Sequence, residues 1–529
     1  MRKWAALAVL ALAQFLMVLD QAVMNVSISQ LVEDFDTNVT TIQAVITLYA
    51  LVMAMLMLTG GKLGDLLGRR RAFTIGLIIY GSGSALTAAS WNVGTLVLGW
   101  SVLEGVGAAL VLPALVALIA ANYEGRDRVA AFGVIGGVSG VGIAVGPIVG
   151  GFFTANLSWR WVFVGEVIVA AAIVLVVRAV ADSRPADRRP QLDVVGAALS
   201  AAGLGTIVIA LLQSSSWGWI EPRRSPITPF GFALTPFVVL AGVGILVVFV
   251  RWQEHRIAVG RDPLVRLGLF ASRTLRAGLS CFFCQNLILL GIFFIVPLYL
   301  QIVLGLDALE TGVRMLPISV TMFVTSTLGP ALAGRVGPRL VVRAGFVLLA
   351  VAAFAMLETI EPELTGIAFG ASLGLLGVGM GLVASQLGNV IQSSVEADDR
   401  SEAGGLQNTA QQVGSAAGTA LVGAIVLSAL IGAFTSTISD DERISAQLAD
   451  ALQVQVAAGG SFVAAADVDA ALVEAGVDAA EVAAVVDGYE AAQLAALRRG
   501  LLFAAFLAVA ALGITGGLPR SLAPGAPST

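Results

Sequence analysis

Long runs without charged residues dominate the chain. Stretches such as 72–103, 129–159 and 277–306 contain no Asp, Glu, Lys or Arg. A helix needs about 20 apolar residues to cross the roughly 30 Å hydrocarbon core of a bilayer. Together with shorter apolar runs and their flanking residues, the pattern predicts an all-α membrane protein with fourteen transmembrane helices, at approximately 5–29, 42–62, 72–91, 95–120, 129–152, 161–179, 194–213, 230–250, 277–302, 312–333, 341–358, 366–392, 404–434 and 500–518.

Polar segments divide these spans into blocks of six, two and six. A Pro- and Arg-rich stretch at 181–190 follows the sixth span, and a basic segment at 251–276 follows the eighth. Halves of equal span number are typical of transporters with pseudo-symmetric bundles. The predicted organisation is a six-helix bundle at 1–180, two linker helices with cytoplasmic loops at 181–273, and a second six-helix bundle at 274–529 with an extracytoplasmic insertion at 435–499.

The first apolar run has two interpretations. Arg2 and Lys3 precede it, and Ala11-Leu12-Ala13 resembles a signal-peptide cleavage site. Cleavage there would leave a short apolar region, whereas the apolar stretch continues to Ile28. The pattern therefore favours a first transmembrane helix.

Composition excludes a water-soluble protein. Of the 529 residues, 57% are hydrophobic and only 12% are charged, against about a quarter in soluble domains. The basic residues give the orientation: with the amino terminus inside, 23 fall on the cytoplasmic side and 7 outside. Both termini are thus predicted to be cytoplasmic in a multi-pass protein of the cell membrane.

The composition also argues against most cofactor chemistry. Cys281 and Cys284 cannot form a disulfide framework, and His255 alone cannot form a multi-histidine metal site or supply much acid–base catalysis. A net charge of −5 offers no basic footprint for nucleic acid, and no Gly-rich phosphate loop with a following Lys is present. We expect no metal, no cofactor, no catalytic residues and no enzyme activity.

The insertion at 435–499 is acidic, with eleven Asp and Glu residues against Arg443 until Arg498. Apolar residues at three- and four-residue spacing predict short amphipathic helices in Ala-rich sequence. The segment is either a solvated linker or a small helical cap over the exit of a pathway, where its acidity would favour cations and a partner could bind.

Several motifs resemble a known family. The loop Gly61-Lys62-Leu63-Gly64-Asp65-Leu66-Leu67-Gly68-Arg69-Arg70-Arg71 resembles the cytoplasmic signature loop of the major facilitator superfamily, and Ala333–Arg339 is a degenerate copy without the acid. Its glycines allow a tight turn and close helix approach. The glycine-rich run 133–151, ending near Gly146 and Pro147, is similar to the fifth-span motif of antiporters in that superfamily, and the proline is expected to bend the helix.

Further motifs narrow the resemblance to fourteen-spanner drug:proton antiporters. They are Leu19–Val26 in span 1, Leu157–Phe163 before span 6, Asp193–Ala197 at span 7 and Pro297–Gln301 in span 9. The resemblance implies a role for the loop and span-5 motifs in conformational gating, through Gly61, Gly64, Asp65, Gly68, Arg69, Arg70, Gly146 and Pro147.

Three departures from the family pattern concern charge. Ser101 and Gln411 stand where an Arg is expected, and Glu166 stands where relatives commonly have Asn. The sequence therefore predicts no cation deep in the membrane to pair with its acids.

Acids inside predicted spans carry the functional prediction. An ionisable group in the bilayer is costly, so Asp20, Glu104 and Glu166 are candidates for function. Because burial penalises the charged form of a carboxyl, each could hold either a proton or a cationic substrate. We expect Asp20 to carry the proton, Glu104 to cooperate and Glu166 to be a weaker third site.

Amides in the predicted spans are candidates for a substrate cavity, although they also hold helices together. They are Asn25, Gln285, Asn286, Gln386, Asn389, Gln407 and Gln411. The resemblance implies proton-coupled export of hydrophobic or cationic small molecules, of the multidrug efflux type, in a bacterial plasma membrane. Two alternatives stay open: export of an endogenous lipid or secondary metabolite, and a transport-dead membrane sensor.

Overall fold

The computed structural model describes residues 2–37, 39–181, 191–222, 225–362, 366–396, 399–457 and 462–521. Within these residues every regular element is a helix. The first half contains α1 (Arg2–Val26), α2 (Ile28–Asp34), α3 (Val39–Leu67), α4 (Arg69–Ala88), α5 (Val93–Leu96), the π-helix η1 (Val97–Glu104), α6 (Gly105–Asn122), α7 (Gly125–Asn156) and α8 (Arg160–Val176).

Two helices, α9 (Val194–Trp217) and α10 (Thr235–Ala258), connect this half to the second. The second half contains α11 (Arg273–Pro297), the π-helix η5 (Leu298–Val303), α12 (Ala308–Val336), α13 (Pro338–Leu357), α14 (Gly366–Ser393), α15 (Arg400–Asp440), α16 (Ala446–Ala457), α17 (Ala465–Glu474) and α18 (Ala479–Ile514).

Twelve segments of the described chain are helical, long and apolar enough to cross a membrane. The other two expected spans, 72–91 and 161–179, correspond to α4 and α8, which do not meet that criterion. Three arginines, Arg69 to Arg71, begin α4, and α8 has only 17 residues. Both helices nevertheless pack against each other, and α4 also packs against α6.

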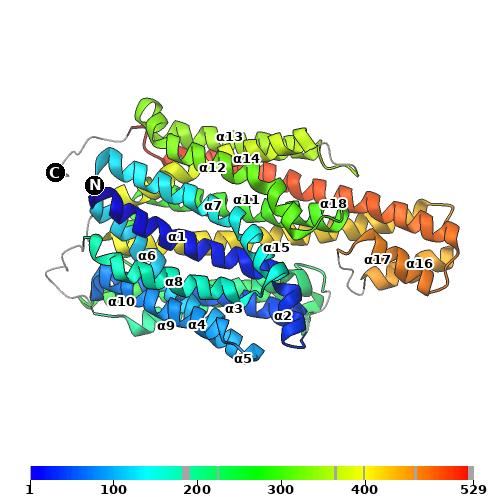
Figure 1. The fold of residues 1–529 in the computed structure, drawn as a ribbon, viewed down its shortest axis with the longest axis horizontal. Helices are drawn as coiled ribbons and strands as arrows, with labels where there is room; N and C mark the ends of the chain where they lie inside the picture. The colour runs from blue at the N-terminus through cyan, green and yellow to red at the C-terminus, as the bar shows by residue number, and fades with distance from the viewer. Residues whose placement is uncertain are drawn as a thin grey trace.

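Each half has its own apolar core. Side chains from α1, α3, α4, α6, α7 and α8 form one buried cluster, and side chains from α11 to α15 and α18 form another. The helices run roughly along the long axis of the molecule (Figure 1). The start of α1 and the end of α18 lie at the same end of the bundle.

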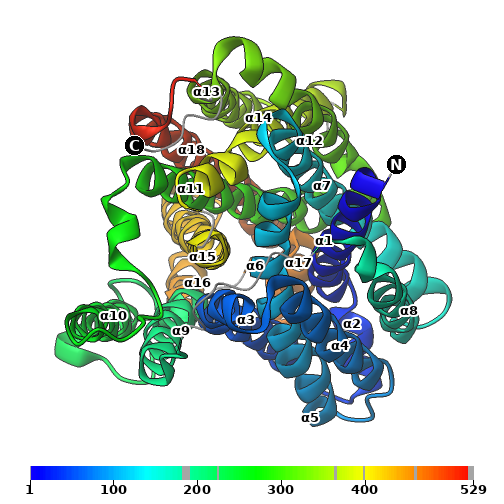
Figure 2. The ribbon, with the colours of Figure 1, turned by 90° about the vertical axis from the view of Figure 1, so that its left-hand side faces the viewer.

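The linker pair lies on one flank. Viewed from the end, α10 is outermost and α9 lies between it and α3 (Figure 2). Helix α9 contacts both α3 of the first half and α15 of the second. The linker therefore bridges the seam between the two halves.

Asp193 anchors the start of this linker. It is the N-cap of α9 and accepts hydrogen bonds from the Gly196 N–H at 2.9 Å, Trp252 Nε1 at 3.0 Å and Gln253 Nε2 at 2.9 Å. Burial raises the pKa of the Asp193 carboxyl, but these donors and the Arg256 guanidinium outweigh it and hold the pKa below the usual value. The capping interaction joins α9 to α10.

The insertion is an extension of the long helices. Helix α15 has 41 residues and α18 has 36, and both project beyond the other helices with α16 and α17 packed beside them (Figure 1). The expected span at 500–518 is thus the second part of α18. Arg443 pairs with Asp441 at 2.8 Å and Asp487 at 3.3 Å, which ties the α15–α16 turn to α18 and lowers the pKa of Asp441.

Candidate functional site

Three acids from separate helices meet inside the first half. Asp20 comes from α1, Glu104 ends η1 and Glu166 comes from α8. One carboxylate oxygen of each lies within 4.8 Å of the others. Their side chains are 0%, 0% and 2% exposed, respectively. The three candidates, which were predicted as separate residues, therefore form one cluster, close enough to share a small cation.

Close helix packing brings Glu104 to this cluster. A Cβ on Gly83 of α4 would lie 2.7 Å from the Glu104 Cγ, and a Cβ on Gly99 of η1 would lie 2.8 Å from the Thr87 backbone nitrogen. Only glycine allows α4 and η1 to approach so closely. The π-helical turn, a form that is frequent at functional sites, ends on the acid itself.

Neutral donors hold one oxygen of each acid. The Trp100 indole donates to Asp20 Oδ1 at 2.8 Å, and Thr87 Oγ1 donates to Glu104 Oε1 at 3.0 Å. Glu166 Oε2 accepts from two hydroxyls, which belong to Tyr80 at 2.9 Å and Ser84 at 3.2 Å. Tyr80, Ser84 and Thr87 recur along one face of α4, at the spacing of a helical stripe.

The second oxygen of each acid has no hydrogen-bond partner. These atoms are Asp20 Oδ2, Glu104 Oε2 and Glu166 Oε1, and all are buried. Among the described residues, no Lys or Arg forms an ion pair with any of the three. At the position where the family resemblance implied an Arg, the Ser101 hydroxyl instead donates to the Val45 carbonyl of α3 at 2.8 Å.

Sequence reasoning missed the aromatic wall of the site. The Tyr49 and Trp100 rings stack at 4.6 Å with an interplanar angle of 8°, and the buried Tyr49 hydroxyl has no partner. Tyr80 is also fully buried. In the sequence, the spacing of these aromatic residues is also typical of ordinary core packing. Only the polar stripe on α4 could have indicated that they belong to a functional site.

The predicted signature loop joins α3 to α4 at the end of the bundle where α1 starts and α18 ends (Figure 1). Gly68 has a φ of 90°, which favours glycine, and it turns the chain from α3 into α4. Asp65 pairs with Arg69 at 3.8 Å, and Arg70 Nη1 donates to the Val180 carbonyl at 3.3 Å. The loop glycines face the other half: a Cβ on Gly64 would lie 2.8 Å from Ser401 Oγ of α15.

Comparison with known proteins decides the family. The model of the Major Facilitator Superfamily matches residues 10–419, well over half of the chain. The chain belongs to the major facilitator superfamily.

Two relatives within this superfamily are named for resistance and efflux. The chain is 33% identical to the puromycin resistance protein pur8 of Streptomyces alboniger, over 80% of this chain and 82% of that protein. It is 30% identical to the multidrug efflux pump LfrA of Mycolicibacterium smegmatis, over 89% of each chain. This major facilitator is therefore a transporter rather than an enzyme, and a multi-pass protein of the cell membrane.

The fold agrees with this assignment. The human organic anion transporter MFSD10 superposes with a TM-score of 0.61 at 13% identity, covering 97% of this chain and 99% of that one. At such low identity the match concerns the fold alone. It supports an all-helical major facilitator fold.

Polar contacts join the two halves of the transporter near the signature loop. Ser401 Oγ donates to the Gly61 carbonyl at 2.8 Å, and Arg400 Nη1 donates to the Ala120 carbonyl at 2.9 Å. Arg128 Nε donates to Asn389 Oδ1 at 2.9 Å. Asn389, expected to line a cavity, is therefore engaged in the contact between the halves.

The other predicted amides are mostly buried in the second half. Gln285 and Gln386 each have one buried oxygen without a partner, as does Gln407. Asn286 donates to the Phe282 carbonyl of its own helix. Gln411 is half-buried, and the side chain of Asn25 lies outside the described residues.

Gly146 marks a close approach of α7 to α1. A Cβ there would lie 2.3 Å from the Ala22 Cβ, two residues beyond Asp20. The span-5 motif thus packs against the helix that carries the first acid. A bend was expected at Pro147, whose side chain lies outside the described residues. Helix α7 itself runs from Gly125 to Asn156.

Proposed function

We propose that this transporter exports hydrophobic or cationic small molecules in exchange for protons. It would do so as a fourteen-span member of the drug:proton antiporters, with six spans in each half, two linker spans and both termini cytoplasmic. The observation that carries the proposal is the cluster of Asp20, Glu104 and Glu166, with no counter-cation among the described residues.

Electrostatics explains why this cluster suits proton coupling. Ionised carboxylates within 4.8 Å of one another repel strongly away from water, so the cluster is stable only when it holds positive charge. Protons on the unpartnered oxygens supply that charge, and a cationic substrate in contact with the cluster would supply it as well. Competition between the two is the thermodynamic basis of exchange.

The three acids take different roles in the proposal. Asp20 carries the exchanged proton, because α1 packs against the α7 glycine motif at Gly146 and so links the acid to a helix that contacts both halves. Glu104 cooperates because its charge interacts with the other two acids of the cluster. Glu166, which already accepts two hydroxyl donors, is the weaker third site.

Alternating access would break and remake the contacts near the signature loop. The Ser401–Gly61, Arg400–Ala120 and Arg128–Asn389 hydrogen bonds join opposite halves at that end. Their presence supports an arrangement in which the cytoplasmic side is closed. Gly61, Gly64, Asp65, Gly68, Arg69 and Arg70 would control opening there, and Gly146 with Pro147 would let α7 adjust against α1.

The relatives support the substrate class. Their names concern puromycin resistance and multidrug efflux, so a broad range of apolar molecules is the first choice. The buried amides Gln285, Gln386 and Gln407, each with a partnerless oxygen, would orient such molecules. The half-buried Gln411 and the Asn25, Asn286 and Asn389 side chains complete the proposed cavity set.

The test is efflux driven by an imposed pH gradient. Purified protein in liposomes should move ethidium and puromycin when the gradient is present and stop when an uncoupler is added. Asp20→Asn should reduce the coupled rate to background, since it removes the exchangeable charge but keeps the acceptor for Trp100. Asp36→Asn is the matched control, because Asp36 is exposed and its φ of 44° suits asparagine.

Proton-coupled transport at an undiminished rate in Asp20→Asn would overturn the assignment of Asp20. Transport by the native chain that ignores both the gradient and the uncoupler would overturn proton coupling. If the protein did not move these compounds but moved a membrane lipid or secondary metabolite in a proton-coupled way, it would be an exporter of that endogenous molecule instead.

A further inference from the structure

A cluster of arginines lies at one end of the second half, where α11 and α13 begin and the chain leaves α18. Its members come from three segments of the sequence and are Arg273, Arg339, Arg343 and Arg520. The other three repel the Arg339 guanidinium, so the four charges are close together in space. We call these residues the arginine cluster. Among the described residues none of them forms an ion pair.

The short turn after α18 brings the members of the cluster together. Its 3-10 helix, Thr515–Gly517, packs against both α11 and α13. A Cβ on Gly517 would lie 2.6 Å from the Ala277 Cβ of α11. A Cβ on Gly337, which precedes α13 with a φ of 85°, would overlap the Arg520 carbonyl oxygen. Glycine at both positions therefore lets this turn fit between the two helices.

Hydrogen bonds fix two guanidiniums of the cluster through their inner nitrogen. Arg339 Nε donates to the Leu518 carbonyl at 2.6 Å, and Arg343 Nε donates to Thr515 Oγ1 at 2.8 Å. Arg339 is half-buried, whereas Arg343 is exposed. The terminal Nη nitrogens of Arg343 make no hydrogen bond within the described chain, so they can donate two parallel hydrogen bonds to a phosphate.

The segments that carry the cluster supply no acid to balance its charge. They contain no Asp or Glu from 263 to 306, from 311 to 357 or from 491 to 529. Among the described residues, the charged groups that act on Arg339 are all arginines. Like charges repel more strongly beside a membrane, where the dielectric constant is lower than in water. An anion bound from outside the chain would therefore stabilise the cluster.

The surface next to the cluster indicates a lipid as the source of that anion. Leu340, Val347, Val351 and Phe354 of α13 are exposed, and their spacing places them on one face of the helix. In a multi-pass membrane protein such a face contacts acyl chains. Arg343 lies on the same face, between Leu340 and Val347. A headgroup bound at Arg343 would have its acyl chains along α13, whereas a free phosphate would make no use of this face.

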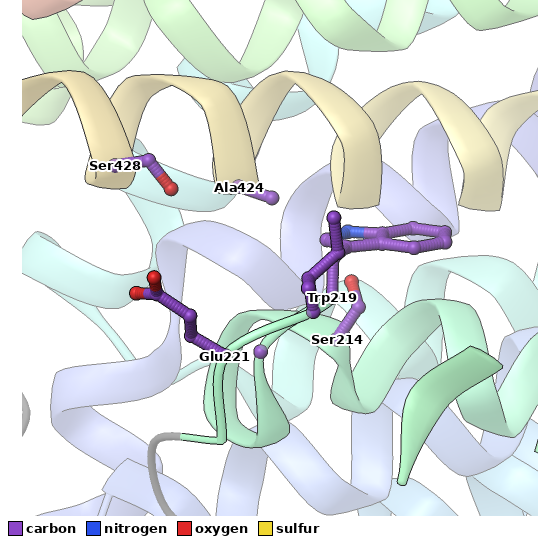
Figure 3. A pocket seen from close by; sticks show the side chains of 7 residues that line it. Ser214, Trp219, Glu221, Ala424 and Ser428 are labelled. Atoms are coloured by element: carbon purple, nitrogen blue, oxygen red, sulfur yellow. The ribbon is translucent and has the colours of Figure 1, made fainter. Parts of the chain in front are cut away.

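The cavity beside the linker pair does not suit the same ligand. It has a volume of about 290 Å³ and lies between the turn after α9 and the middle of α15 (Figure 3). The Glu221 carboxylate lines it, and no Lys or Arg is among its described lining residues. This carboxylate would repel an anionic headgroup, so the arginine cluster is the better site for one.

We propose that the arginine cluster binds the headgroup of an anionic phospholipid whose acyl chains lie along the exposed face of α13. Basic clusters at the membrane surface attract anionic lipids, and an arginine can hold a phosphate with two parallel hydrogen bonds. The lipid would hold the turn after α18 against α11 and α13. It is a bound component of the protein rather than an exported solute, so its binding does not depend on proton coupling.

The test measures lipid binding to the purified full-length protein by native mass spectrometry. Phosphatidylglycerol is compared with phosphatidylcholine of the same acyl chains, because both contain a phosphate but only phosphatidylglycerol has a net negative charge. Phosphatidylglycerol should bind about tenfold more tightly, which is the effect expected of one charge-assisted contact. Excess inorganic phosphate should not displace it, since phosphate has no acyl chains.

Variants that each remove one charge assign the binding to the cluster. Arg343→Gln should weaken phosphatidylglycerol binding about tenfold and leave phosphatidylcholine binding within about twofold. Arg273→Gln and Arg520→Gln should each weaken it about threefold. Both replace exposed side chains that form no hydrogen bond within the described chain, so they test the site even if Arg343→Gln folds poorly. Arg261→Gln is the matched control, because Arg261 is exposed in the loop after α10 and lies outside the cluster.

Three outcomes would overturn the proposal. Equal binding of the two lipids by the native protein would mean that the arginines only orient the chain in the membrane. Displacement of phosphatidylglycerol by inorganic phosphate would mean that the cluster takes a free anion. An unchanged preference for phosphatidylglycerol in all three cluster variants would place the lipid elsewhere on the protein.

Discussion

The two halves of this transporter share a helical architecture but have different polar interiors. The first half buries three carboxyls, whose bound oxygens accept from the Tyr80, Ser84, Thr87 and Trp100 side chains. The second half buries amides, including Gln285 and Gln386. Carboxyls exchange charge and amides do not, so the proposed function assigns proton exchange to the acids of the first half and substrate orientation to the amides of the second.

The halves also differ at their corresponding loops. The signature loop of the first half presses glycines against α15, whereas Gly334 in the degenerate second copy would accept a Cβ with no heavy atom within 4 Å. Of the two loops, only the signature loop is therefore expected to pack tightly against the opposite half.

The largest expected difference in efflux between variants of the two halves comes from removing a charge. Glu104→Gln keeps an acceptor for Thr87 but removes a charge from the acidic cluster, so pH-driven efflux should fall by about tenfold or more. Gln386→Leu, in the second half, should lower the apparent affinity for substrate by about threefold and leave the pH dependence unchanged. Efflux from liposomes, measured over a range of internal and external pH, checks both.

The opposite pattern would end the proposed division. If Gln386→Leu altered the pH dependence while Glu104→Gln altered only substrate affinity, the acids would belong to substrate binding. Thermal unfolding of each purified variant serves as the control for folding.

An intermediate effect is expected at the two loops. A Cβ on Gly61 would lie 2.9 Å from the Ser401 backbone carbonyl, which has little freedom to move. Gly61→Ala should therefore hinder closure between the halves and slow efflux about three- to tenfold, whereas Gly334→Ala should stay within about twofold of the native rate. Equal rates for the two variants would show that the signature loop does not need its close approach.

Hydropathy predicted most of the fold because the lipid bilayer restricts which segments can span it. Spans in lipid must be apolar and helical, so charge-free runs located the transmembrane helices well. The same criterion did not predict that the helix of the last expected span, 500–518, extends well before Arg498 and Arg499. In the structure α18 begins at Ala479, and Arg498 is accommodated by donating to the Ile360 carbonyl at 2.8 Å.

The acidic site was predictable only as separate residues. Asp20, Glu104 and Glu166 were identified because acids are rare in lipid, but their convergence depends on how four helices rotate about their axes. That rotation is set by contacts between distant glycines, such as Gly83 and Gly99, and sequence spacing within one helix does not reveal it. Trp100 and Tyr49 were missed for the same reason.

The smallest expected effect tests whether the linker pair is a structural bridge rather than part of either functional half. Asp193→Ala removes the α9 cap and leaves the Trp252 and Gln253 donors unpaired, so thermal stability should fall while substrate affinity stays unchanged. The pKa of Asp193 is lowered in the folded chain, so its stabilising contribution is present above the ordinary value of 3.8 and is lost as the pH falls below it. The stability difference between the native protein and Asp193→Ala should hence be constant from about pH 5 to 8 and shrink below about pH 4. Asp193→Asn keeps a capping oxygen and should lose less stability at neutral pH. A difference that instead grew on acidification would mean that Asp193 is not held as an ionised cap, and the linker would need another anchor to bridge the seam.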